Sequence, residues 1–204
     1  MACFIFAAGS FYGLQTRPQE GDYIIAADGG WLTCRSCGIE PTVLMGDFDS
    51  LEKLPDFARI ERFPVEKDDT DMMLAIKAGL SRGETEFHLY GGMGGKRTDH
   101  TIANLQALAY LARHGAHGCL YGDGEVYTAI CDESMTFVAR QEGILSVFCM
   151  GADAEGVTIE GGQYVVRNVK LSADFPLGVS NHFVGEPITI SVKKGCLLIG
   201  CRGE

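Results

Sequence analysis

The stretch VLMGDFDS, residues 43–50, places two aspartates directly after a run of apolar, strand-forming residues. In an extended segment, residues two apart point the same way, so Asp47 and Asp49 would aim at one spot beyond the end of the strand. Ligands of open α/β sheets bind at such strand ends. Two converging carboxylates suit a hard cation, and Mg²⁺ commonly takes one or two of them together with substrate phosphates. The alternative is a plain Asp-rich turn with a cap at Ser50.

On both sides of this stretch, short apolar runs alternate with helical stretches, over roughly the first 130 residues, which is typical of a parallel α/β sheet. Glycines follow the expected helices and support their ends. We therefore expect residues 1–132 to form an α/β domain with a mainly parallel, Rossmann-like sheet. Its expected strands are 2–8, 22–28, 42–46, 86–91 and 118–122, and its expected helices are 29–38, 68–83 and 99–115.

The character of the sequence changes after this region. From Thr136 onward, alternating apolar and polar residues recur between turn residues, and no convincing amphipathic helix remains. This pattern predicts a small all-β domain, a sandwich or a barrel. We place the boundary near Glu133, so the second domain is expected over residues 133–204.

Bulk composition limits the classes of function. The 204 residues are 46% hydrophobic and 22% charged, with a formal net charge of −10. This balance is typical of a globular protein, and it disfavours nucleic-acid binding, which needs clustered Lys and Arg. An anionic substrate such as a nucleotide would need a cation beside it. No apolar run approaches the roughly 20 residues of a membrane helix, so no membrane partner is expected.

The eight cysteines lie mostly in apolar surroundings, where a free thiol acts as a small hydrophobic residue. A chain of this length does not need disulfide staples, so we expect reduced cysteines and a cytoplasmic location. Cys34 and Cys37 form one C-x-x-C pair. A zinc site would need a second pair of ligands at matching spacing, which the sequence lacks. The pair is expected on a partly buried helix.

A second acidic cluster, KDDTD, lies where the helix at 68–83 is expected to begin. Asp and Thr at a helix start cap its free N–H groups and suit the helix dipole, so Thr70 and one or two of the acids need no further explanation. Three acids in four residues exceed that need. Asp68 and Asp71 share one face of the first turn, and we interpret them as further ligands of the same metal ion.

Two glycine-containing loops also follow expected strands. The stretch GGMGGKRTDHTIANL, residues 91–105, precedes a helix, and glycines there let the backbone approach phosphates. Lys96 and Arg97 add positive charge, so we expect anion binding; the alternative is a flexible turn with a solvated basic pair. In AADGG, residues 26–30, Asp28 either caps the next helix or bonds the ribose or base of a nucleotide, with Gly29 and Gly30 beside it.

Taken together, DGG, GDFDS, KDDTD and GGMGGKRTDHTIANL occur in the order and spacing of the thiamine pyrophosphokinase family, and GVSNHF, residues 178–183, is similar to its C-terminal Ser-Asn segment. The resemblance spans nearly the whole chain. It implies an α/β catalytic domain that binds ATP, a β-sandwich domain that helps to bind thiamine, and a homodimer with each active site between two subunits. It implies a reaction in which ATP and thiamine give thiamine diphosphate and AMP.

The resemblance also implies roles for individual residues. Mg²⁺ would lie on Asp47, Asp49 and Asp71, and Asp68 would join them or face thiamine. The phosphates and the thiamine would be contacted by residues of later motifs: Gly94, Gly95, Lys96 or Arg97, Ser180 and Asn181. Independently of the resemblance, the attacking hydroxyl needs a carboxylate to accept its proton, and Asp71 and Asp99 are the two candidates. Two alternatives are a metal-dependent nucleotide-sugar transferase, since D-x-D loops hold metal-bound diphosphates, and a nucleotide-binding module without catalysis.

Overall fold

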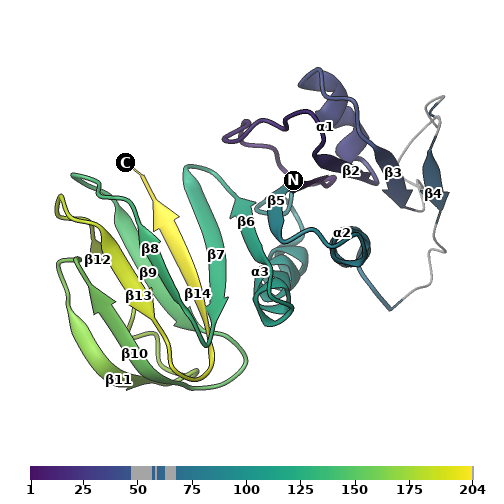
Figure 1. Cartoon of the computed structure of the whole chain (residues 1–204). Coiled ribbons are helices and arrows are strands. Elements are labelled where there is room, and N and C mark those ends of the chain that lie inside the picture. The colour runs from purple at the N-terminus through teal and green to yellow at the C-terminus, as the bar shows by residue number, and fades with distance from the viewer. Residues whose placement is uncertain (47–56, 58, 63–67, 204) are drawn as a thin grey trace. The chain divides into compact units, whose positions relative to one another are not determined.

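The computed structural model describes residues 1–46, 57, 59–62 and 68–203 (Figure 1). The chain divides into two compact units, the first made of Met1–Ala107 with Gly118–Asp123 and the second of Leu108–His117 with Gly124–Glu204. By this division strand β7, Glu125–Cys131, groups with the second unit, although it precedes the boundary that the sequence analysis places between 132 and 133. In the described ranges, no helix is long and apolar enough to span a membrane.

The first unit is built on strands in the spatial order β6-β5-β1-β2-β3-β4. From β5 to β4 each neighbouring pair is parallel, as the alternation of strands and helices predicts. The strands are β1 Cys3–Phe6, β2 Tyr23–Ala27, β3 Val43–Gly46, β4 Ile60–Arg62, β5 Glu86–Tyr90 and β6 His117–Tyr121. The helices are α1 Gly30–Ser36, α2 Asp71–Ser81 and α3 Thr98–Arg113, whose first ten residues belong to this unit.

The central strands of this unit are buried along their length. All four residues of β1 and of β3 are buried, as are the last four of β5. Continuous burial is typical of parallel strands that are covered on both faces, because their connecting helices pack on the sheet. Helices α1 and α2 both contact β1 and β2. The carboxyl ends of these strands are thereby held at one edge of a rigid sheet.

The second unit contains two antiparallel sheets, ordered β12-β9-β14-β7 and β11-β10-β13-β8. Their inward side chains form one hydrophobic core, to which Ile130, Leu145 and Leu197 come from the first sheet and Val157 and Ile190 from the second. Described residues from Gly124 onward include no helix, as expected. The remaining strands are β8 Ser134–Phe137, β9 Ile144–Cys149, β10 Ala154–Glu160, β11 Val166–Leu171, β12 Asn181–His182, β13 Ile188–Ser191 and β14 Cys196–Arg202.

Two cysteines correct the expectation that all eight thiols are reduced. Cys131 and Cys196 form a disulfide between β7 and β14. They lie directly opposite each other in the antiparallel register, with Cα atoms 4.1 Å apart. Because 65 residues separate them along the chain, the sequence alone gives no sign of the pairing. The expectation was wrong for these two, while the other six cysteines lie outside any disulfide in the described part of the chain.

The C-x-x-C pair lies on and just after helix α1, as expected. Cys34 is buried, and burial raises the pKa of its thiol to about 12. Thiol chemistry and metal binding require the thiolate, so a buried thiol of this kind is inert. Cys37 follows the helix at its C-cap, and Gly38 is left-handed with φ +63°. The geometry is that of a helix end.

Candidate functional site

A cavity of about 520 Å³ lies in the first unit, at the carboxyl ends of β1, β2 and β5. The starts of helices α2 and α3 complete its wall. Because parallel strands end at one edge of the sheet, four loops that are far apart in sequence meet there. The cavity is lined by Ala7, Ala8, Gly9, Ser10, Ala27, Asp28, Thr70, Asp71, Met72, Gly91, Gly92, Gly94, Gly95, Lys96, Arg97, His100 and Asn104.

The glycine-rich loop after β5 forms one side of this cavity. Gly94 and Gly95 have φ of +69° and +78°, the left-handed region that glycine enters without steric cost. Gly92 is held in place by helix α3, because Asn104 Nδ2 donates to the Gly92 carbonyl oxygen at 2.8 Å. Asn104 is buried, so this hydrogen bond is shielded from water. The loop thus exposes main-chain groups to the cavity from a fixed position.

Helix α2 begins at the cavity. Thr70 is extended, with φ −70° and ψ 158°, and its hydroxyl accepts a hydrogen bond from the Met73 N–H at 3.2 Å. This is the N-cap that the sequence predicts. Asp71 is the first residue of the helix and lines the cavity with Thr70. A carboxylate and a helix N-terminus therefore face the same space.

We expect Thr70→Ala to lower the free energy of unfolding by about 1 kcal/mol, because the Met73 N–H loses its acceptor. Thr70→Ser keeps the hydroxyl and should retain most of that stability. Urea unfolding followed by circular dichroism measures both. Equal stability of the alanine variant and the wild type would contradict the capping role.

Positive charge reaches the cavity through Lys96 and Arg97. Arg97 is also paired with Asp99, its Nη2 lying 2.7 Å from Asp99 Oδ2 and its Nε 3.0 Å from Oδ1. The hydrogen bonds from Arg97 lower the pKa of Asp99 to about 2. Both side chains are well exposed, and Asp99 is not among the residues that line the cavity. Asp99 therefore orients Arg97 in this structure and is a fixed anion.

Asp28 lines the cavity at the end of β2 and is itself left-handed, with φ +49°. This conformation is uncommon for a residue other than glycine and often marks a functional position. The N-cap position of α1 is taken by Gly29, which has no side chain to cap the helix, so both alternatives for Asp28 stay predictions. Gly30 lies against β1, since a Cβ there would collide with the Phe6 carbonyl oxygen. Gly29 and Gly30 thus support the loop and lie outside the lining.

Some predicted site residues are not brought to the cavity or cannot be placed. Asp68 is exposed and outside the lining. Asp47 and Asp49 lie outside the described residues. Within the described ranges, no group of three or more His, Cys, Asp or Glu side chains could hold a metal ion. Asp28 and Asp71 are the described carboxylates that reach the cavity.

Ser180 and Asn181 belong to the second unit. Ser180 is left-handed, with φ +62°, and its N–H donates to Ser146 Oγ at 3.1 Å. Asn181 is buried, and its amide holds Tyr164: Oδ1 accepts from the Tyr164 N–H at 2.9 Å, and Nδ2 donates to the Tyr164 carbonyl at 2.7 Å. A thiamine contact by these two residues stays a prediction; the side chain of Asn181 has a structural role.

Three lining residues on helices α2 and α3 were not among the predicted site residues. Asn104 lies within the quoted TIANL stretch, and a polar residue on the buried face of a helix was the signal that could have found it. Met72 is buried at the first turn of α2, and His100 lies in the first turn of α3. Neither gives a chemical signal in the sequence, because a single methionine or histidine on a helix is more often structural.

The fold and the cavity define a class: α/β proteins whose ligand site lies at the carboxyl edge of a parallel sheet. Residues 15–120 match the family model described as thiamin pyrophosphokinase, catalytic domain, and residues 135–197 match thiamin pyrophosphokinase, vitamin B1 binding domain. The chain therefore belongs to the thiamin pyrophosphokinase family. Membership makes it an enzyme of the thiamine diphosphokinase class.

Individual proteins agree with this result. Thiamine pyrophosphokinase of Bacillus subtilis is 28% identical over 191 residues, covering 86% of this chain and 85% of that protein. The crystal structure of thiamine pyrophosphokinase from Bacillus subtilis superposes with a TM-score of 0.90 at 22% identity over 100% of both chains. That of Geobacillus thermodenitrificans gives 0.85 at 24% identity, covering 100% of this chain and 98% of the other.

Proposed function

We propose that the chain transfers the pyrophosphoryl group of Mg-ATP to the hydroxyl of thiamine, giving thiamine diphosphate and AMP. The observation that best supports this is the cavity of the first unit, in which a glycine loop, a helix N-terminus, two cations and two carboxylates meet at the strand ends. In this proposal the first unit is a Rossmann-like ATP-binding domain. The second is a β-sandwich that contributes to thiamine binding.

The cavity suits a triphosphate. Backbone N–H groups of a glycine loop and the positive end of a helix attract phosphate oxygens. Lys96 and Arg97 supply charge that a chain of net charge −10 otherwise lacks at an anion site. In the proposed complex Gly94 and Gly95 lie against the phosphates, and Arg97 or Lys96 pairs with their oxygens. Phosphoryl-type transfer depends mainly on such positioning and charge neutralisation.

The donor set fits Mg²⁺. Asp28 and Asp71 bring carboxylate oxygens to the lining of the cavity, and oxygen is the ligand that Mg²⁺ prefers. Asp71, with Asp47 and Asp49, would hold the ion. A bound Mg²⁺ would neutralise part of the negative charge of the triphosphate.

The attacking hydroxyl of thiamine must lose its proton. Of the two carboxylates predicted for this step, Asp99 is the weaker acceptor, because hydrogen bonds from Arg97 lower its pKa to about 2. We therefore assign proton acceptance to Asp71, which lines the cavity. Asp99 would serve by holding the Arg97 guanidinium in a fixed direction.

We further propose a homodimer in which Ser180 and Asn181 of one subunit complete the site of the other. On the chain just before them, three large apolar side chains are exposed: Phe175 by 64%, Leu177 by 61% and Val179 by 44%. Exposed apolar groups of this kind mark interaction surfaces. A cytoplasmic location is part of the proposal and is supported by the six cysteines outside a disulfide, while the Cys131–Cys196 disulfide opposes it.

The test is to incubate the protein with ATP, Mg²⁺ and thiamine and to separate the products chromatographically. We expect AMP and thiamine diphosphate in equal amounts, and neither product when thiamine is omitted or EDTA is added. ADP as the nucleotide product, or a sugar-dependent reaction, would contradict the proposal. Nucleotide binding without any turnover would instead favour a non-catalytic module.

A further inference from the structure

The segment between β1 and β2, residues 7–22, forms one wall of the cavity through its first four residues. It crosses the glycine loop closely. The Gly9 N–H donates to the Gly91 carbonyl oxygen at 3.0 Å. The Tyr12 hydroxyl lies where a Cβ on Gly94 would be, so the two segments touch. The shape of this wall therefore depends on what holds residues 7–22 in place.

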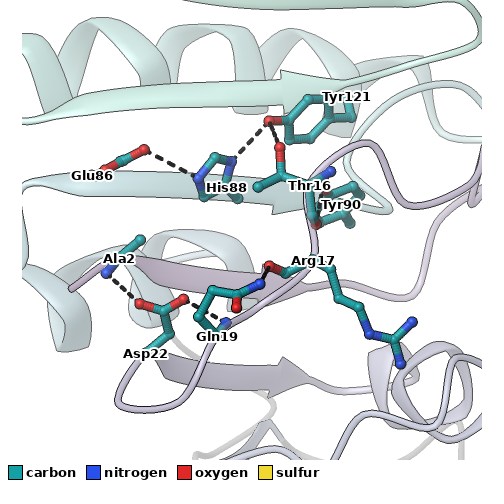
Figure 2. Close-up of polar contacts among 9 residues, drawn as sticks. All are labelled: Ala2, Thr16, Arg17, Gln19, Asp22, Glu86, His88, Tyr90 and Tyr121. Carbon is teal, nitrogen blue, oxygen red and sulfur yellow. Dashed lines mark hydrogen bonds and ion pairs between the residues drawn. The ribbon is translucent and has the colours of Figure 1, made fainter.

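One residue, Tyr90, holds this segment at two points. Its carbonyl oxygen accepts a hydrogen bond from the Ala7 N–H at 2.9 Å. Its hydroxyl accepts from the Thr16 N–H and donates to the Thr16 carbonyl oxygen, both at 3.0 Å (Figure 2). Tyr90 is also the last residue of β5, directly before the glycine loop. The loop and the facing wall thus share one anchor.

A second tyrosine, Tyr121, also contacts Thr16. The Thr16 hydroxyl lies 3.3 Å from the Tyr121 hydroxyl, and the Tyr121 hydroxyl lies 2.8 Å from His88 Nδ1 (Figure 2). Burial lowers the pKa of His88, which favours the neutral ring. Nε2 lies 3.4 Å from Glu86 Oε1, and a proton placed there leaves Nδ1 to accept from Tyr121. With this tautomer, the Tyr121 oxygen is the acceptor for the Thr16 hydroxyl.

The anchor is rigid. Tyr90 is 1% exposed, His88 7% and Tyr121 8%. The Tyr90 and Tyr121 rings stack at 4.6 Å between centroids, and Phe4 stacks on His88 at 4.5 Å. Burial raises the pKa of both tyrosines, so both hydroxyls remain protonated donors. A hydrogen-bond network whose rings are buried in this way permits few alternative arrangements.

We propose that Tyr90 and Tyr121, with His88 behind them, are positioning residues that hold residues 7–16 in the shape that binds the nucleotide. None of the three belongs to the described lining of the cavity, so they act through the segment. That the ligand is a nucleotide rests on the proposed function. That these residues hold the segment in place rests on the hydrogen bonds alone.

Tyr90→Phe tests this, because it keeps the ring and removes the hydroxyl. In the ligand-free protein we expect amide hydrogen exchange of residues 8–17, followed by mass spectrometry, to become about 10-fold faster. With substrates, we expect the KM for ATP to rise about 5- to 10-fold while kcat stays within about 2-fold. Tyr121→Phe removes only one contact with Thr16, to its hydroxyl, and should give a smaller change in the same direction.

Tyr23→Phe is the matched control. Tyr23 is 3% exposed in β2, the neighbour of β1, and its ring packs under the Arg82 guanidinium at 4.1 Å. For Tyr23→Phe we expect the same amide hydrogen exchange of residues 8–17, and the same KM for ATP, as for the wild type. The inference is overturned if Tyr90→Phe matches this control, or if its exchange rises evenly over the whole first unit. If the wild type forms no AMP, the proposed function fails, and local exchange alone then decides the positioning role.

Discussion

Asp71→Asn is expected to lower the rate of AMP formation about 10³-fold while the protein remains folded. The change keeps the shape of the side chain and removes a carboxylate from the cavity wall, where Lys96 and Arg97 also lie. In the proposed reaction that carboxylate both holds Mg²⁺ and accepts the thiamine proton. Its contribution to helix α2 is small, since an acid in the first turn stabilises a helix by about 0.3–1 kcal/mol. Initial rates at saturating Mg²⁺, with a thermal melt, measure both effects.

The matched control is Asp69→Asn, the same change two residues earlier in the same acidic cluster. Asp69 pairs with Lys77, Oδ2 lying 2.7 Å from Nζ, and lies outside the lining of the cavity. Exposed ion pairs contribute about 0–1 kcal/mol, so stability and rate should both be close to wild type. Near-wild-type turnover of Asp71→Asn, or an equal loss in both variants, would refute the assigned role of Asp71.

Gly91→Ala is expected to lower the free energy of unfolding by about 3 kcal/mol or more. Two causes add. Gly91 has φ +70°, which costs an L-residue with a side chain about 1 kcal/mol. A Cβ there would also collide with the Ala7 carbonyl oxygen and lie 2.9 Å from its carbonyl carbon, and neither is a movable side chain. The wall and the glycine loop would have to separate, so ATP binding should weaken as well.

Gly115→Ala carries the first cause alone, so the difference between the two variants measures the second. Gly115 has nearly the same φ, +72°, but a Cβ there meets no atom within 4 Å. We expect a loss of only about 1 kcal/mol and unchanged turnover. Urea unfolding of both variants gives the comparison. If the two variants lose equal stability, the close approach of Ala7 to Gly91 does not matter energetically.

Much of the site could be predicted from the sequence, because its residues lie at strand ends that local patterns reveal. Asp28, Thr70, Asp71 and the glycine loop each follow an apolar run or begin a periodic one. In a parallel sheet such positions meet at one edge by topology alone. The sequence therefore places these side chains together without knowledge of any long-range contact.

What the sequence could not predict depends on contacts between distant segments. Thr16 meets Tyr90 across 74 residues, and the Cys131–Cys196 pair depends on the register of two strands. Local pattern contains no information on either. The short edge strand β4 was also missed, since its three residues, IER, lack alternation. Asp71 and Asp99 were left as alternative proton acceptors, because the sequence does not show that Arg97 pairs with Asp99 and lowers its pKa to about 2.

The cap of helix α2 couples stability to the shape of the cavity. Thr70 begins the helix by accepting from the Met73 N–H, and it also lines the cavity. Residues that cap well are few, chiefly Ser, Thr, Asp, Asn and Gly. Replacing Thr70 with any other residue should therefore cost stability and alter the wall at once, which narrows the choices open to an engineer who wishes to reshape the site.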